Sequence, residues 1–334
     1  MENATVPQQP KKAGLNKAFV RVLFAKPWFS SVLCLVVLSL LVGIVNPVYF
    51  SMDNVLDVMR TASFALIIAA PLVLLFISGG TDLSLGAAVT LGGVVVGKCL
   101  LAGIPVFPSV LIAMAAGFAV GIVKAAIIMT FDLPPFIITL GLQYIINSIV
   151  LVWTAGMNVV GLPAAFKWMG QSAIFGRLYI SVLIAAAVSV VFHVLLQTTK
   201  FGRAVCAVGG NRETAYLAGL NVKFYKYCTN IMVSVMAAFT GCVYASRFSS
   251  GITTMGVGLE MNSIASVVIG GTSMFGGSGT VPGAAIGCVL FAAIKNSLIM
   301  LGVPTFYQNM VFGVMLIGSI IIDVYRRKAA TAVS

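Results

Sequence analysis

Two glycine-rich interruptions carry polar side chains into an otherwise apolar chain. They span residues 78–86 and 270–280; each contains Gly-Gly-Thr after a hydrophobic run, and a Gly-Ala-Ala triplet follows. Paired breaks of this kind are where transporters tend to bind their solutes. A carboxylate at mid-bilayer costs about 2.5–3.5 kcal/mol, so Asp82 should face a pore or the cytoplasm, or cap the helix that follows. The groups here that could bind a polar solute are Thr81, Asp82, Ser84 and Thr272.

Polar side chains inside other hydrophobic runs are further candidates for binding a polar solute. Amides can bind the hydroxyls of a neutral solute, whereas an intramembrane lysine either snorkels to the interface or lines a cavity. Glu260 can instead cap the helix that it begins. The chain has one histidine, so neither a metal cluster nor a hydrolytic triad can be assembled, and we do not expect an enzyme. The further candidates for a solute pathway are Gln143, Asn147, Asn262, Lys295 and Asn296.

A polar island at residues 209–219 separates two long apolar runs. Asn211 is a candidate N-cap, and Glu213 near the start of a short helix suits the helix dipole. Small residues on one face would let such a helix sit deep in a groove on a partner; the alternative is a solvated connecting loop. The residues that we expect to contact a cytoplasmic partner are Asn211, Arg212, Glu213, Thr214, Ala215 and Gly219.

One motif does not predict nucleotide binding. Residues 92–99 fit the phosphate-binding pattern G-x-x-x-x-G-K, but the last position is Cys99 instead of a Mg²⁺-binding Ser or Thr. The stretch also lies inside an apolar run and not between a strand and a helix. If ATP drives this protein, another chain binds it.

Composition places the chain in a bilayer. Of 334 residues 60% are hydrophobic and 8% charged, against about 25% charged in a soluble domain. The net charge of +12 does not indicate nucleic acid, because thirteen of the twenty basic residues fall in three clusters beside apolar runs, near 11–26, 200–226 and 326–328. This positive-inside pattern predicts that both termini and the island are cytoplasmic.

The hydrophobic runs predict an all-α, polytopic membrane helix bundle of about ten transmembrane helices. The eighth is short and glycine-rich, which predicts a broken or re-entrant segment. We expect a basic cytoplasmic tail at 1–28, one transmembrane domain at 29–325 and a cytoplasmic tail at 326–334. The predicted spans lie near 29–49, 57–78, 84–103, 108–130, 134–153, 179–198, 226–247, 261–273, 283–301 and 306–324.

Five blocks of residues resemble the permease subunits of ribose-type ABC importers. Residues 76–86 (FISGGTDLSLG) are similar to the family's GGIDLSVG signature, and residues 133–141 (LPPFIITLG) to its PPFIATLG block. Further blocks match in the same order at 199–211, 260–272 and 276–283.

The resemblance covers about residues 30–328, and it implies a permease domain whose coupling helix lies near 211–219. It implies that an ABC ATPase docks there and uses ATP and Mg²⁺, while this chain binds no cofactor. Further implied partners are an extracytoplasmic solute-binding protein, a second permease copy or paralogue, and lipid of the bacterial cytoplasmic (inner) membrane. The island departs from the broader importer motif at Thr214 and lacks its Ile-x-Leu-Pro ending, which is commonly degenerate in the sugar branch.

The resemblance implies import of a small neutral solute, a monosaccharide such as ribose. Alternatives within the same superfamily are a nucleoside, a furanose signalling molecule or a branched-chain amino acid. An amino-acid site would need charges for carboxylate and ammonium, and few intramembrane charges are present. An ion-coupled secondary transporter is an alternative of another class, which Asp82 and His193 support only thinly.

Overall fold

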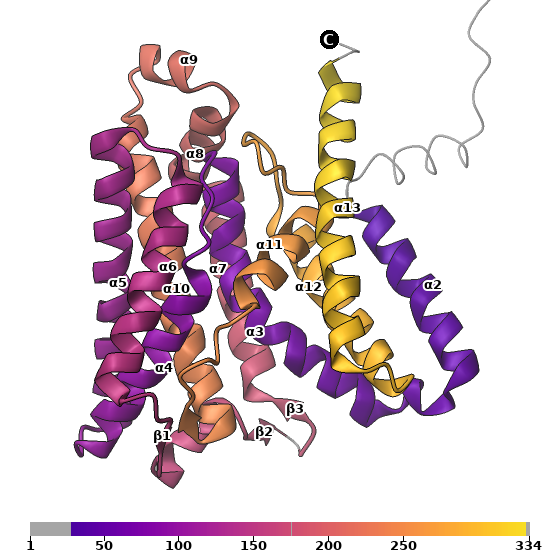
Figure 1. Cartoon of the computed structure of the whole chain (residues 1–334). Coiled ribbons are helices and arrows are strands. Elements are labelled where there is room, and N and C mark those ends of the chain that lie inside the picture. The colour runs from indigo at the N-terminus through magenta and orange to yellow at the C-terminus, as the bar shows by residue number, and fades with distance from the viewer. Residues whose placement is uncertain (1–27, 175, 332–334) are drawn as a thin grey trace, which may run out of the picture.

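Helices account for most of the computed structural model, which describes residues 28–174 and 176–331 (Figure 1). Each predicted span corresponds to one apolar helix. The helices are α2 (Phe29–Val45), α3 (Met52–Ile77), α4 (Leu85–Leu101), α5 (Val106–Phe131), α6 (Pro135–Thr154), α7 (Ile180–Thr198), α8 (Lys200–Gly210), α9 (Arg212–Leu217), α10 (Val222–Phe248), α11 (Leu259–Ile269), α12 (Val281–Met300) and α13 (Thr305–Thr331).

The helices differ in length. Within the described residues, six are long and apolar enough to cross a membrane, namely α3, α5, α6, α7, α10 and α12, and α2, α4 and α11 are shorter apolar helices. The first predicted span stops earlier than expected: α2 ends at Val45, and a 3₁₀ helix, η1 (Pro47–Phe50), follows. Pro47 explains this end, because proline disfavours helical backbone at the residue before it.

The predicted tails lie at the edges of the described chain. Residues 1–27 of the predicted N-terminal tail are outside the described residues. At the other end, α13 continues helically to Thr331, through most of the predicted tail 326–334.

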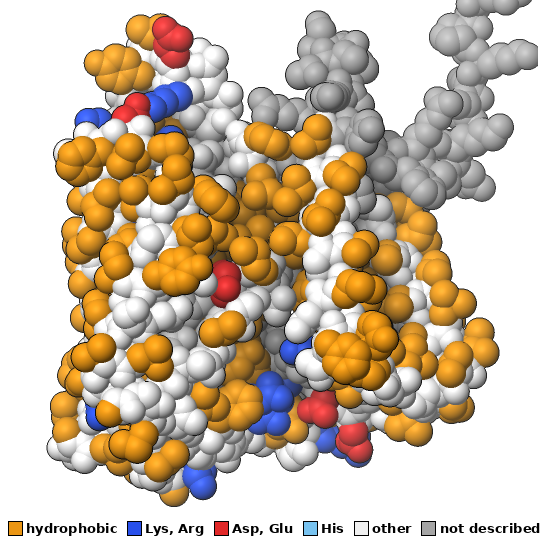
Figure 2. Space-filling view, in the orientation of Figure 1, with side chains coloured by type: hydrophobic (Ala, Val, Ile, Leu, Met, Phe, Trp, Pro, Cys, Tyr) orange, Lys and Arg blue, Asp and Glu red, His pale blue; other side chains and the backbone are white. Residues whose placement is uncertain are grey.

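Short strands lie at the end of the bundle opposite α9 (Figure 1). Strand β1 (Val159–Val160) pairs antiparallel with β4 (Ser250–Gly251), and β2 (Ala173–Ile174) pairs with β3 (Leu178–Tyr179). A 3₁₀ helix, η2 (Ala164–Met169), lies between them in the chain. On the face shown in Figure 2 most charged side chains lie near the two ends, one acidic side chain lies between them, and apolar side chains cover much of the rest, which suits a surface in contact with lipid.

Helix α10 packs closely against α4 and α5 at the centre of one half of the bundle. Two glycines of α5 allow this approach, because a Cβ on Gly117 would lie 2.6 Å from that of Ala238, and one on Gly121 would lie 2.7 Å from the Cα of Ile231. Close helix approach through small residues is the usual packing mode in membranes. This packing holds the ends of α4, α5 and α10 in fixed relation.

The eighth predicted span, 261–273, is short: α11 is continuous over 11 residues, Leu259–Ile269, whereas a helix that crosses the bilayer needs about 20. After α10 the chain runs without helix past α4, where Gly251 lies against Gly93 and Gly256 against Gly86, and α11 begins only at Leu259. Non-helical backbone is tolerated at membrane depth where protein covers it, and α4 provides that cover. Two interrupted segments, the starts of α4 and of α11, therefore lie side by side.

Candidate coupling helix and polar groups of the helix breaks

Helix α9 forms a short projection at one end of the bundle (Figure 1). As predicted, Asn211 is its N-cap: the side-chain Oδ1 accepts hydrogen bonds from the backbone N–H groups of Glu213 and Thr214, both at 3.0 Å. Glu213 lies in the first turn, where the helix dipole favours a carboxylate. Gly219 closes the projection with a positive φ of 83°, a conformation that glycine adopts at little cost.

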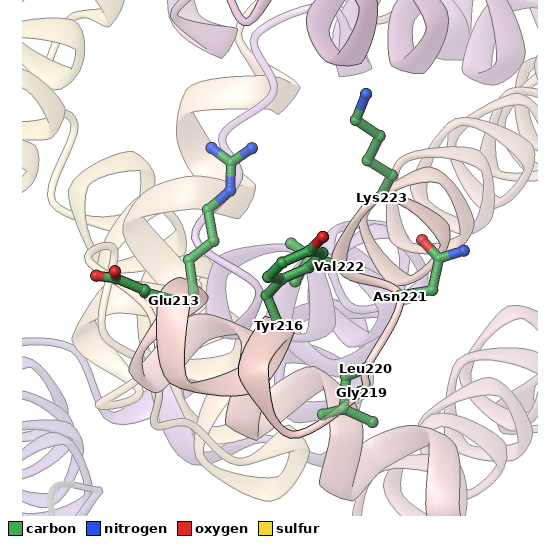
Figure 3. Close-up of a pocket in the computed structure, with 8 residues that line it drawn as sticks. Glu213, Tyr216, Gly219, Leu220, Asn221, Val222 and Lys223 are labelled. Atoms are coloured by element: carbon green, nitrogen blue, oxygen red, sulfur yellow. The ribbon is translucent and has the colours of Figure 1, made fainter.

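The exposed surface of α9 is polar in its first turn and apolar at its end. Tyr216 is 71% exposed and Leu217 is 79% exposed, whereas Ala215 is buried against Val208 and Val222. A small residue on the inner face thus lets α9 lie close to the protein's own body. The hollow between α9 and the start of α10 (Figure 3) has a volume of about 810 Å³ and is lined by Arg212, Glu213, Tyr216, Gly219, Leu220, Asn221, Val222 and Lys223.

Backbone contacts between glycines connect α9 to the body of the protein. The backbone N–H of Gly277 donates to the carbonyl of Ile77 at 2.9 Å. Gly209, in the last turn of α8, is packed so tightly against the same carbonyl that any Cβ there would collide with it. The segment before α9, the end of α3 and the second glycine-rich break therefore meet at one point, which we call the glycine junction (Gly209, Ile77, Gly276 and Gly277).

Asp82 is fully buried in a network of charge and hydroxyl groups. Its Oδ1 accepts from the backbone N–H of Ser84 at 2.8 Å and from the Ser84 hydroxyl at 2.6 Å. Its Oδ2 forms a salt bridge with Lys124, which also donates to the Ser234 hydroxyl at 2.7 Å. The network joins the break before α4 to α5 and α10.

Lys124 was not among the residues that we selected from the sequence. The signal that could have found it is a lysine in the interior of the apolar run 108–130, since an intramembrane charge calls for a partner. Nothing local identifies that partner, because Asp82 is 42 positions away.

Gln143 and Glu260 meet where the two interrupted segments adjoin. The Gln143 side-chain amide donates to Glu260 Oε1 at 3.3 Å, and the backbone N–H of Gly258 does so at the same distance. Glu260 is 6% exposed, and its Oε2 packs against Gly86 in the first turn of α4. Asn262 lies in the same first turns of α11 and is half-buried. An acceptor group, an amide and two helix N-termini thus converge here.

The other candidates around the breaks are more dispersed. Asn147 lies one turn beyond Gln143 on α6 and is half-buried, as is Thr81 beside Asp82. Thr272 is fully buried, and its hydroxyl has no hydrogen-bond partner among the described residues.

Lys295 and Asn296 do not lie with these groups. The Asn296 side chain donates to that of Asn54 at 2.8 Å, and Asn54 is in the first turn of α3, whereas Asp82 follows the last turn of the same helix. A helix of 26 residues is about 39 Å long. These two candidates therefore belong to the other end of the bundle.

Comparison with known proteins identifies the family to which the chain belongs. The family model described as "Branched-chain amino acid transport system / permease component" matches residues 54–320. The chain is 31% identical over 301 residues to the ribose import permease protein RbsC of Bacillus subtilis, which covers 89% of this chain and 92% of that protein.

Two further relatives are similar over at least 81% of their own length. The D-allose transport system permease protein AlsC of Escherichia coli is 31% identical over 90% of this chain and 93% of its own. The autoinducer 2 import system permease protein LsrC of Yersinia enterocolitica is 30% identical over 88% of this chain and 81% of its own. No solved structure matches the chain. The chain therefore belongs to this family of transport permeases and is a multi-pass membrane protein.

Proposed function

We propose that this chain is the transmembrane permease subunit of an ATP-driven ABC importer that translocates a small neutral solute, a monosaccharide such as ribose. The observation that carries the proposal is the exposed helix α9, tied through the glycine junction to both helix breaks. Relatives named for ribose and allose transport support a sugar as the solute.

The charges inside the bundle favour a neutral solute. Asp82 and Lys124 neutralise each other, both fully buried, and so are not available to an amino acid's ammonium and carboxylate groups. Of the remaining polar groups at the breaks, the Glu260 carboxylate accepts hydrogen bonds from Gln143 and Gly258, and Gln143, Asn262 and Thr272 are uncharged donors and acceptors suited to hydroxyls. The mutual pairing of Asp82 and Lys124 disfavours a branched-chain amino acid as the solute, despite the wording of the family description.

The proposed partners follow from the ends of the bundle. An ABC ATPase, which supplies ATP and Mg²⁺ chemistry, would dock on α9 in the cytoplasm, and a solute-binding protein would dock at the end that carries the short strands. A second permease copy or paralogue completes the pathway in the bacterial cytoplasmic membrane, with both termini cytoplasmic. Closure of the ATPase would move α9, and only contacts that differ between two states can couple this motion to the pathway.

Charging the exposed tip of α9 should abolish recovery of the ATPase. Leu217→Asp places a carboxylate where we expect a desolvated apolar contact, and burying an unpaired charge at an interface is costly. We expect a tagged variant, purified from native membranes, to retain less than about a tenth of the ATPase that wild type retains.

Ile174→Asp is the matched control, because Ile174 is an exposed apolar residue in β2, at the opposite end of the bundle. It should leave ATPase recovery unchanged. Equal recovery by Leu217→Asp and wild type would refute docking at α9.

The energy source for uptake, ATP or an ion gradient, distinguishes the proposed importer from an ion-coupled transporter. Cells that carry the chain with its partners should lose uptake of radiolabelled D-ribose or D-allose on ATP depletion, and keep it on brief treatment with an uncoupler. The reverse pattern would favour ion coupling. The ligand that co-purifies with the solute-binding protein identifies the solute.

A further inference from the structure

A second hollow lies beneath the start of α9, on the side facing the helix bundle. Its volume is about 330 Å³, within the range of small-molecule sites. Its walls come from the ends of α3 and α5, the starts of α6, α9 and α10, and the turns between them. The polar residues among those that line it are Ser78, Asp132, Arg212, Lys226 and Asn230.

The hollow holds an excess of positive charge. Lys226 is half-buried, and among the described residues no carboxylate lies within salt-bridge distance of its ammonium group. Arg212 has a partner, Asp132, but at 3.4 Å and with both side chains exposed. Such a surface pair contributes little, so an anionic ligand could compete for Arg212. A half-buried cation without a counter-charge favours binding of an anion.

The hollow calls for a hydrogen-bond donor on the ligand as well as an anionic group, because of Asn230. This side chain is 4% exposed, and its amide orientation is fixed because Nδ2 donates to the carbonyl of Lys226 at 2.8 Å. Within the described part of the chain the amide oxygen Oδ1 has no hydrogen-bond partner, and Asn230 lines the hollow. A buried acceptor without a donor costs free energy that a ligand hydroxyl would recover.

We propose that this hollow binds a hydroxylated phosphate ester from the cytoplasmic side, with the phosphate on Lys226 and Arg212 and a hydroxyl donating to Asn230 Oδ1. Neither a simple anion nor a neutral sugar satisfies both requirements. Two sources share this chemistry: a soluble sugar phosphate, and the headgroup of phosphatidylglycerol, whose glycerol hydroxyls flank a phosphate.

Occupancy would act on transport through Arg212, which is the first residue of α9. A phosphate that draws Arg212 away from Asp132 breaks the ion pair between α9 and the α5–α6 turn. This regulatory consequence rests on the proposed role of α9 in coupling, whereas the binding site itself does not. A soluble phosphorylated sugar in this site would report intracellular supply to the importer.

Binding can be measured on the full chain alone, in nanodiscs of phosphatidylcholine, by calorimetric titration with D-ribose 5-phosphate. Inorganic sulfate, which has no hydroxyl donor at neutral pH, and D-ribose, which has no anionic group, are the control probes, and both should bind at least about tenfold more weakly. Lys226→Met removes the cation, and Asn230→Asp keeps the shape while placing a carboxylate beside Lys226. Each should weaken the ester at least about tenfold. Lys200→Met, an exposed cytoplasmic-end lysine outside the hollow, should leave binding unchanged.

A second experiment distinguishes the soluble ester from the lipid headgroup. Wild type and the two variants, Lys226→Met and Asn230→Asp, are reconstituted in phosphatidylglycerol nanodiscs, and the lipid that each retains is measured by native mass spectrometry. Titratable ester binding that both variants weaken supports a soluble ligand. Phosphatidylglycerol retained by wild type and lost from both variants supports the lipid headgroup. Absence of both signals, or binding that neither variant weakens, overturns the site. Because no partner protein is present, this result is independent of whether uptake is ATP-driven.

Discussion

Gly209→Ala should abolish solute uptake while the chain still inserts into the membrane. The added methyl group would collide with the carbonyl oxygen of Ile77, and this oxygen cannot simply move aside because it also accepts the 2.9 Å hydrogen bond from Gly277. Relief requires α8 to shift away from α3, and α9 moves with it. Overpacking of this kind costs about 1–3 kcal/mol, concentrated at the joint that we propose transmits force.

The neighbouring glycine provides a closely matched control. Gly210 is in the same last turn of α8, and a Cβ there would meet nothing within 4 Å. Both substitutions add one methyl group to adjacent glycines and raise helix propensity equally. We expect uptake by Gly210→Ala near the wild-type rate, and uptake by Gly209→Ala at least about tenfold lower at equal membrane abundance.

Hydrolysis of ATP by the reconstituted complex tests whether the defect lies in coupling. Gly209→Ala should retain ATPase docking and basal hydrolysis but lose the stimulation that solute-loaded binding protein brings. Uptake by Gly209→Ala within twofold of Gly210→Ala would show that the glycine junction does not transmit the motion.

The helices and the cap of α9 could be predicted because their signals are local. Hydrophobic runs identify each apolar helix, and Asn211 caps the helix that its sequence indicates, whereas the predicted first span, 29–49, runs four residues beyond the end of α2 at Val45. The glycines of the eighth run likewise predict a short helix: α11 has 11 residues and ends at Ile269, directly before Gly270 and Gly271, whereas a re-entrant course stays a prediction.

The contacts between distant segments could not be predicted in this way. Glu260 and Gln143 are 117 positions apart, and the sequence suggests only a helix cap for the first and a pathway lining for the second. The direction of Ala215 is a second case: a small residue allows close approach of either the protein's own body or a partner, and only tertiary packing distinguishes them. Asn296 is similar, because its partner Asn54 is 242 positions away.

Lys124→Met should destabilise the folded protein more than any other single change considered above. The substitution keeps the length of the side chain but leaves the Asp82 carboxylate buried without its counter-charge. Removing one partner of a buried pair costs about 3–5 kcal/mol, because the remaining charge stays desolvated. The two hydrogen bonds from Ser84 offset part of this cost, but they cannot neutralise the charge.

The double variant Asp82→Asn/Lys124→Met separates charge from packing. Neutral replacement of both partners is often tolerated where loss of one is not, so the double variant should recover most of the stability lost in Lys124→Met. Lys98→Met removes a lysine from the last turn of α4, away from this network, and should cost little. The thermal stabilities of wild type, Lys124→Met, Lys98→Met and the double variant can be ranked by heating the detergent-solubilised proteins and measuring aggregation by size-exclusion chromatography.

Uptake by the double variant then shows what the ion pair contributes beyond stability. The pair joins the break before α4 to α5, and Lys124 extends the link to Ser234 on α10. If the break stays fixed during transport, a neutral, folded substitute should transport normally. If the break moves, the strength of the link sets the balance between the two states, and uptake should change although stability is restored. A double variant no more stable than Lys124→Met would instead mean that the two charges do not act as a pair.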